Sequence, residues 1–477
     1  MLLGGALLRF ACQFTFRPWW CGDSAGYSAP FYLWLHHAFS DAGRTPVYPL
    51  FLALGQWLSA SKAAVLLSAP AALVVTWMQN LLGVATAVLV YHLLRALGVA
   101  VRTASIAATG FALVVAVCRF EMMVLTFSLS MFTLTLGAWL LVRAILEIGR
   151  GSPGQAWAVV AGGTFGVAGL VRADNLVFFA VAVGLCAWHA LRLALEPAQR
   201  PLAVRLARGC LWLPLGAAPW IFAWMTVNYI GLGQFRLTTI LGYQNTQAVY
   251  NLWDRVEPRD QVLGGIMTKY YRLTNSPGAK ETAFVWQANP EIQSRAMEMP
   301  VVVLHPAMRH IDVGDYLGQV SRRLAARFPG IWLKNAATSF WQNSFDFHYA
   351  DTSPGERVDP VAVDGAEVIK RPSLWRGEVW LAGFEAPGLL VCYLLTLVWA
   401  AGGFVALVRA GAAARLEDVA VTALALGTVG TFVTFCLVES FHNQYSEPHL
   451  AVLVVCAGYT CHRFSARGRA PVPSEKC

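Results

Sequence analysis

The sequence predicts an all-α polytopic membrane protein, and three observations support this prediction. Of 477 residues, 57% are apolar and 13% are charged, so most of the chain cannot fold as a water-soluble globule. Several windows contain the roughly 20 mostly apolar residues that a helix needs to cross a bilayer. These apolar runs are long and unbroken instead of alternating in short segments, which favours helices over a closed β-barrel.

The charge pattern is that of a membrane protein with basic loops. The net charge is +9, but the arginines are scattered between apolar runs and form no stripe or tail, so no nucleic-acid partner is expected. Eight of the 10 cysteines lie in or beside apolar segments. With no CxxC pair and no Cys/His cluster at zinc spacing, we expect neither a disulfide framework nor a structural metal.

Ten membrane-spanning helices are expected, with boundaries defined to a few residues. Their predicted ranges are 2–16, 64–94, 103–118, 122–142, 156–171, 175–190, 209–231, 379–408, 418–438 and 449–462. The first range is short for a span, and its helix could be truncated by the start of the sequence. Because it lacks a small-residue cleavage site, we interpret it as a transmembrane helix and not as a removed signal peptide. The apolar stretch PVYPLFLALGQWL could be a further span or a juxtamembrane or re-entrant element. We prefer the second interpretation because an eleventh span would invert one end of the molecule.

With ten spans and the N-terminus inside, the arginines obey the positive-inside preference. The arginines then placed in the cytoplasm are Arg95, Arg102, Arg143, Arg150, Arg192, Arg200, Arg205, Arg208, Arg409, Arg415, Arg463, Arg467 and Arg469. This topology divides the chain into an N-terminal membrane module (1–231) with a first external loop (17–63), an external insertion (232–378), C-terminal membrane helices (379–462) and a cytoplasmic tail (463–477). Within the insertion, apolar residues at helical spacing predict two amphipathic helices separated at Phe328-Pro329.

The same topology places charged groups from five parts of the sequence on the external side. They are Asp23, Arg44, Arg119, Glu121, Arg172, Asp174, Glu439 and His442. Ionisable groups at membrane depth are costly unless they are paired or line a wet cavity, so their gathering indicates a site. The alternative is that each one simply caps a helix at the interface.

The first external loop carries two of these candidates. Tyr27 begins a helical repeat of apolar residues typical of a helix lying in the membrane interface, and Asp23 stands just before it. Asp23 could be the N-cap of that helix, or Ser24 could take that role and leave Asp23 facing a cavity. Arg44 precedes Thr45-Pro46-Val47-Tyr48-Pro49, a stiff turn that would hold a guanidinium near a phosphate. A headgroup contact of Arg44 without any catalytic part is the alternative.

Several motifs together resemble the GT-C class of membrane glycosyltransferases, which includes the protein O-mannosyltransferases and the aminoarabinose transferases of lipid A. They are, in order, GDS followed by GRTPVYPLFLAL, FEMMVLTFSL, GGTFGVAGLVRADNLVF, PWIFAWMTVNYIGLGQFRLTTILGYQN and NQYSEPHLAVL. The chain departs from the family pattern at Ala173-Asp174, where the family often has Pro after the arginine, and at Gln444, where Arg usually precedes Tyr445.

The resemblance implies an enzyme that transfers a hexosyl or pentosyl group from a polyprenyl-phosphate donor to a lipid, glycan or protein acceptor. Asp23 would be the catalytic base of an inverting displacement. Glu121 would be a second catalytic acid residue that orients the acceptor or Asp23. The basic and phenolic side chains expected at the donor phosphate are Arg44, Arg172, Arg119, Tyr48, Tyr445 and His442.

The remaining expectations concern cofactors, location and rival functions. No cofactor is expected; a divalent metal shared by Asp23 and Glu121 is an alternative that we do not favour, because no DxD lies near either residue. A multi-pass location in a bacterial inner membrane, with the active site on the periplasmic side, fits the resemblance. A transporter or flippase of lipid-linked substrates would also use external charges, but it predicts repeat symmetry or broken helices that the sequence does not show. A non-catalytic assembly scaffold is a third possibility.

Overall fold

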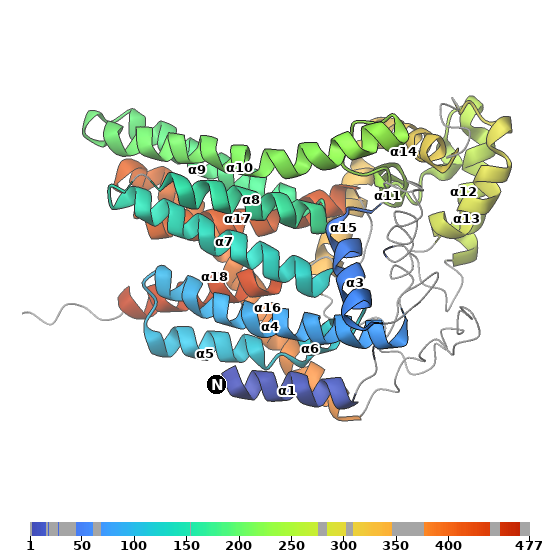
Figure 1. Cartoon of the computed structure of the whole chain (residues 1–477). Helices are drawn as coiled ribbons and strands as arrows, with labels where there is room; N and C mark the ends of the chain where they lie inside the picture. Colours follow the sequence, from blue (N-terminus) through green and yellow to red (C-terminus); the bar gives the residue numbers. More distant parts are fainter. Residues whose placement is uncertain are drawn as a thin grey trace, which may run out of the picture.

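The computed structural model describes a bundle of roughly parallel helices with a smaller helical layer across one end (Figure 1). It describes residues 2–15, 18, 27, 44–60, 68–152, 154–274, 284–301, 309–345, 376–438 and 449–467. The bundle helices are α1 (Leu2–Thr15), α4 (Ala69–Ala96), α5 (Val101–Ala112), α6 (Val115–Glu121), α7 (Phe127–Gly149), α8 (Gln155–Val171), α9 (Asn175–Ala194), α10 (Arg200–Leu232), α16 (Arg376–Ala410), α17 (Leu416–Val438) and α18 (Leu450–Arg467).

Six of the described helices are long and apolar enough to cross a membrane, which confirms an integral, polytopic, all-α membrane protein. These spans lie within α4, α7, α9, α10, α16 and α17, while α8 and α18 are shorter apolar helices. Each of the ten predicted ranges overlaps a described helix, but the count of ten spans stays a prediction. The third range is divided, because α5 ends at Ala112 and α6 runs from Val115 to Glu121.

The stretch PVYPLFLALGQWL forms the separate helix α3 (Val47–Leu58), which has 12 residues. Such a helix is about 18 Å long and falls short of the roughly 30 Å hydrocarbon core. Figure 1 shows α3 running across the end of α4 instead of alongside the bundle. The length and direction of α3 agree with the juxtamembrane interpretation.

The insertion forms the layer at that same end, here called the insertion end of the bundle (Figure 1). Its helices are α11 (Leu241–Gln247), α12 (Gln261–Thr274), α13 (Phe284–Ser294), α14 (Arg309–Arg327) and α15 (Pro329–Phe345). They share a core of buried side chains that includes Trp253, Phe284 and Leu317 and is separate from the main core of the bundle. The predicted break at Phe328-Pro329 is confirmed, since α14 ends and α15 begins there.

Polar contacts join the insertion to the bundle. The indole of Trp332 in α15 donates a hydrogen bond to the carbonyl of Leu437 in α17 at 3.0 Å.

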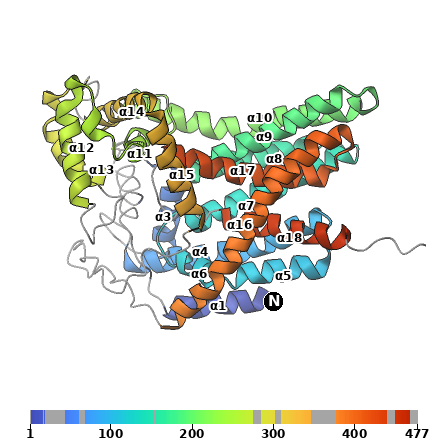
Figure 2. The same cartoon turned by 180° about the vertical axis from the view of Figure 1, so that it is seen from behind.

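Seen from behind, α16 crosses the bundle obliquely (Figure 2). The turns between α4 and α5, α7 and α8, α9 and α10, and α16 and α17 lie at the end of the bundle opposite the insertion (Figure 1).

Two helix ends direct the chain into the insertion end. Helix α10 stops at Gly233, whose φ of 69° is a left-handed conformation that glycine adopts without a steric penalty. Helix α8 stops at Arg172, which is extended (φ −149°, ψ 124°). Asn175 holds this second turn, because its side-chain amide donates to the Ala168 carbonyl and to the Ser130 hydroxyl, both at 2.9 Å.

Candidate functional site

A cavity of about 660 Å³ opens at the insertion end, between the bundle helices and the insertion. Its walls come from the first external loop, the turn before α7, the α8–α9 junction, the α10–α11 connection, α11, α14 and the end of α17. The ionisable side chains that line it are Tyr27, Arg44, Arg172, Asp174, Arg236, Asp315 and Arg322. Pockets of this size are in the range that holds small ligands.

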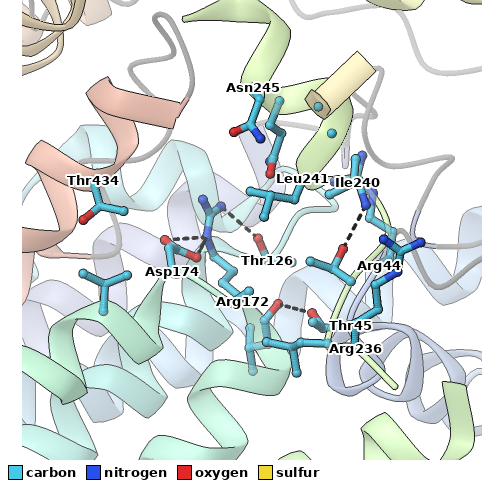
Figure 3. A pocket seen from close by; sticks show the side chains of 18 of the residues that line it. Arg44, Thr45, Thr126, Arg172, Asp174, Arg236, Ile240, Leu241, Asn245 and Thr434 are labelled. Carbon is cyan, nitrogen blue, oxygen red and sulfur yellow. Dashed lines mark hydrogen bonds and ion pairs between the residues drawn. The ribbon is translucent and has the colours of Figure 1, made fainter. Parts of the chain in front are cut away.

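Arg172 and Asp174 form an ion pair on the bundle side of the cavity. The Arg172 Nε lies 3.3 Å from the Asp174 Oδ1, and Nη1 donates to the hydroxyl of Thr126 at 3.3 Å. Figure 3 shows Arg172 between these two partners. Both members of the pair are largely buried, with side chains 10% and 12% exposed, so the guanidinium is held in one orientation at the cavity wall.

Arg44 is held beside Arg172 by the chain that follows it. Thr45 donates its hydroxyl proton to the carbonyl of Val171 at 3.0 Å, a bond that joins positions 126 residues apart. Each partner of this bond is next in sequence to one of the two arginines. The Arg44 guanidinium also lies 4.5 Å from the ring centroid of Tyr27 and donates to its hydroxyl at 3.4 Å.

Arg236 and Asp315 form a two-pronged ion pair across the cavity, between the α10–α11 connection and α14. The Arg236 Nη1 lies 2.6 Å from the Asp315 Oδ1, and Nη2 lies 3.1 Å from Oδ2. The backbone of Arg236 is fixed in turn, because Asn228 in α10 donates to its carbonyl at 2.7 Å. This pair ties α14 to the α10–α11 connection, which Asn228 anchors to the bundle helix α10.

The cavity therefore has an excess of positive charge. Four arginines and two aspartates line the cavity, and each aspartate is already paired with one of the arginines. Arginine in a partly enclosed site favours phosphate or carboxylate ligands, which it binds through parallel donors. The cavity is thus suited to anionic ligands.

The structure places Tyr48 and Glu121 behind this cavity, not in its wall. Tyr48 is fully buried and donates to the side chain of Gln79 at 2.9 Å, while Gln79 donates to the carbonyls of Glu121 and Met123, both at 2.7 Å. The carboxylate of Glu121 is fully buried against Arg9 of α1. These contacts fix the turn that carries Thr126 into the cavity.

Other predicted site residues lie outside the described part of the chain. Asp23, His442 and Tyr445 fall in ranges that the structure does not describe, and Arg119 belongs to α6 but its side chain is not described. Among the described residues, no group of three or more His, Cys, Asp or Glu side chains could hold a metal ion.

Sequence reasoning missed several cavity residues. Asp174 was among the external charges but received no role, and Thr126, Arg236, Asp315 and Arg322 were not singled out. Asp315, Gly318, Gln319 and Arg322 recur at helical spacing, a pattern that could have indicated one polar face of α14.

Comparison with known proteins was made by sequence and by structure. No family model matches the sequence, and no curated protein matches it. The oligosaccharyltransferase of Archaeoglobus fulgidus, in the apo form, is 11% identical with a TM-score of 0.49 over 98% of this chain. The same organism's AglB in complex with an inhibitory peptide and a dolichol-phosphate is 12% identical with a TM-score of 0.47. ArnT from Cupriavidus metallidurans bound to undecaprenyl phosphate is 14% identical, with a TM-score of 0.36 over 94% of this chain and 77% of ArnT.

These structural neighbours are GT-C glycosyltransferases, the class that the sequence motifs resemble. The chain spans about half the length of the archaeal oligosaccharyltransferase, covering 50% of it.

Proposed function

We propose that this chain is a membrane glycosyltransferase that moves a sugar from a polyprenyl-phosphate donor to an acceptor on the external face of the membrane. The observation that carries the proposal is the cavity at the insertion end, where guanidiniums from distant segments border one hollow. A donor with a long apolar tail and an anionic head requires such a positive site at one end of a membrane bundle. The motif resemblance to the GT-C class agrees with this assignment.

Arg44 and Arg172 are the proposed ligands of the donor phosphate. The bond from Thr45 to Val171 holds their backbones next to each other, and both residues line the cavity. Asp174 and Thr126 hold the Arg172 guanidinium in one orientation at the cavity wall, through Nε and Nη1. Two guanidiniums would stabilise the charge that develops on the departing phosphate. Arg119, His442 and Tyr445 remain candidates for further contacts to the same group.

The reaction is a single displacement with inversion at the anomeric carbon. The acceptor oxygen or nitrogen forms a bond to the anomeric carbon while the bond from that carbon to the phosphate oxygen breaks, and the electron pair leaves with the polyprenyl phosphate. The acceptor proton passes to a carboxylate, proposed to be that of Asp23. Asp23 lies four residues before Tyr27, which lines the cavity, and four residues span at most roughly 14 Å.

The test uses the full chain in lipid nanodiscs supplied with undecaprenyl-phosphate-linked hexoses and pentoses and with a membrane extract as acceptor. Mass spectrometry follows free undecaprenyl phosphate and glycosylated products. Asp23→Asn is expected to lower transfer about 100- to 10,000-fold while undecaprenyl phosphate still binds. As a matched control, Arg327→Gln changes an exposed arginine of α14 that does not line the cavity and should leave transfer unchanged.

One outcome would refute the role of Asp23, and another would refute the transferase itself. Unchanged transfer by Asp23→Asn would remove this residue from the mechanism. Movement of the lipid-linked sugar between leaflets, without release of undecaprenyl phosphate from any donor, would identify a flippase instead.

A further inference from the structure

We infer that the insertion side of the cavity is a second anion site, centred on Arg322, which binds a negatively charged group of the acceptor; this inference rests on the proposed function. Both aspartates that line the cavity are already paired. Asp174 is paired with Arg172 and Asp315 with Arg236. Within the described part of the chain, the guanidinium of Arg322 makes no hydrogen bond or ion pair, although it lines the cavity. Its full positive charge is therefore available to a ligand.

Helix α14 has two distinct faces. Val313, Leu317, Val320 and Leu324 are buried in the core of the insertion. Asp315, Gly318, Gln319 and Arg322 follow the opposite face and all line the cavity. Because the apolar face is fixed in the core, the polar face must point into the cavity, and Arg322 is one helical turn beyond Gly318 on it.

Helix α14 is in close contact with α11. A β-carbon added at Gly242 would lie 1.8 Å from the carbonyl oxygen of Gly314, so the two backbones touch. This contact brings the side chains of Gln244 and Asn245 to the same wall as Gln319. The wall thus offers amide donors and acceptors around one guanidinium, a combination suited to a hydroxylated molecule that carries a phosphate or carboxylate.

The position of this wall separates it from the donor. The donor phosphate is anchored by a tail in the bilayer, and Arg44 and Arg172 belong to segments that adjoin the bundle helices. Arg322 and the amides belong to the insertion, on the other side of the cavity. An acceptor that approaches from outside the bilayer meets this wall, and its anionic group would bind Arg322 while its hydroxyl or amine faces the sugar.

The test measures binding of two probes to the full chain in nanodiscs of uncharged lipid. The probes are undecaprenyl phosphate, for the donor side, and glycerol 3-phosphate, for the anion of the acceptor. Protein saturated with undecaprenyl phosphate should still bind glycerol 3-phosphate. Arg322→Gln is expected to weaken this second binding at least tenfold and to leave undecaprenyl phosphate binding within about twofold, whereas Arg44→Gln should do the reverse. Arg327→Gln is the control for lost surface charge on the same helix.

Arg322 is exposed, so its substitution should not disturb folding, and the thermal unfolding midpoint of each variant checks this. The inference fails if saturated wild-type protein binds no glycerol 3-phosphate, or if Arg322→Gln binds it as well as wild type does. It also fails if Arg322→Gln weakens only the binding of undecaprenyl phosphate, because Arg322 would then serve the donor phosphate. Arg322-dependent binding of glycerol 3-phosphate by a chain that binds no undecaprenyl phosphate would leave the anion site in place and refute the proposed function.

Discussion

Arg9 of α1 and Glu121 of α6 form a buried ion pair, although 112 positions separate them in the sequence. The Arg9 Nε lies 2.8 Å from the Glu121 Oε2, and the two side chains are 2% and 0% exposed. Arg9 also donates to the carbonyl of Ala112 at 2.6 Å. Gly83 of α4 provides the space for the Glu121 carboxylate, since a β-carbon at this position would lie 1.8 Å from the Glu121 Oε1. This pair fastens α1 to the turn that leads into the cavity.

Removing one partner of this pair should destabilise the protein strongly. Glu121→Gln leaves the Arg9 charge buried without a counter-ion, and breaking buried pairs in this way typically costs about 3–5 kcal/mol. The thermal unfolding midpoint in detergent should fall markedly. The double variant Arg9→Met/Glu121→Leu replaces the pair by apolar side chains of similar size and should recover most of the loss.

The same variants separate a structural role of Glu121 from a catalytic one. If Glu121 acts only through α1 and the turn, the stable double variant should transfer sugar at close to the wild-type rate per folded molecule. A double variant that is stable but inactive would instead support the catalytic role expected from the sequence.

The contact between α11 and α14 makes a second prediction. Gly242→Ala forces a methyl group against the backbone of Gly314, and such overpacking typically costs about 1–3 kcal/mol. We expect a lower unfolding midpoint together with weaker binding of glycerol 3-phosphate. Gly265→Ala is the matched control, because Gly265 is exposed in α12 with nothing within 4 Å of an added β-carbon. This control should be neutral or slightly stabilising, since alanine favours helix over glycine.

The extent to which the sequence predicts this molecule can be followed through single residues. Long apolar runs predicted the helices of the bundle, and Pro329 marked the boundary between α14 and α15, because these are local signals. Arg44 and Arg172 were expected in one site, and both line the cavity. The partners of Glu121 and Arg236 were beyond prediction, because the ion pairs with Arg9 and Asp315 depend on how distant helices pack. No local pattern in the sequence specifies such a contact.

A buried tyrosine in the insertion predicts a loss of stability at high pH. Tyr316 donates its hydroxyl proton to Asp260 at 2.7 Å, and Arg323 donates to the other oxygen of Asp260 at 2.7 Å. Burial first, and then the bond to Asp260, raise the pKa of Tyr316 above its ordinary value. The stabilisation linked to this shift is fully present below the unfolded pKa of about 10 and is lost as the pH rises towards the folded pKa.

The measurement is the unfolding midpoint of the full chain between about pH 8 and pH 11. Wild type should lose stability above about pH 10 more steeply than Tyr316→Phe, which has no proton to release at this position. Equal slopes for wild type and Tyr316→Phe would contradict the linkage.

The geometry of Arg172 predicts that its shape matters as well as its charge. Nε and Nη1 hold Asp174 and Thr126, so the guanidinium is oriented by two contacts before any ligand arrives. Lysine keeps the charge but has one compact ammonium, which cannot bond Asp174 and Thr126 and still present a donor to a phosphate. Arg172→Lys should therefore weaken undecaprenyl phosphate binding about tenfold, and Arg172→Gln should weaken it more.

Arg192→Lys, at the opposite end of the bundle, controls for the substitution itself and should bind undecaprenyl phosphate as wild type does. Wild-type affinity in Arg172→Lys would show that Arg172 contributes only a point charge, and wild-type affinity in Arg172→Gln would remove it from the donor site.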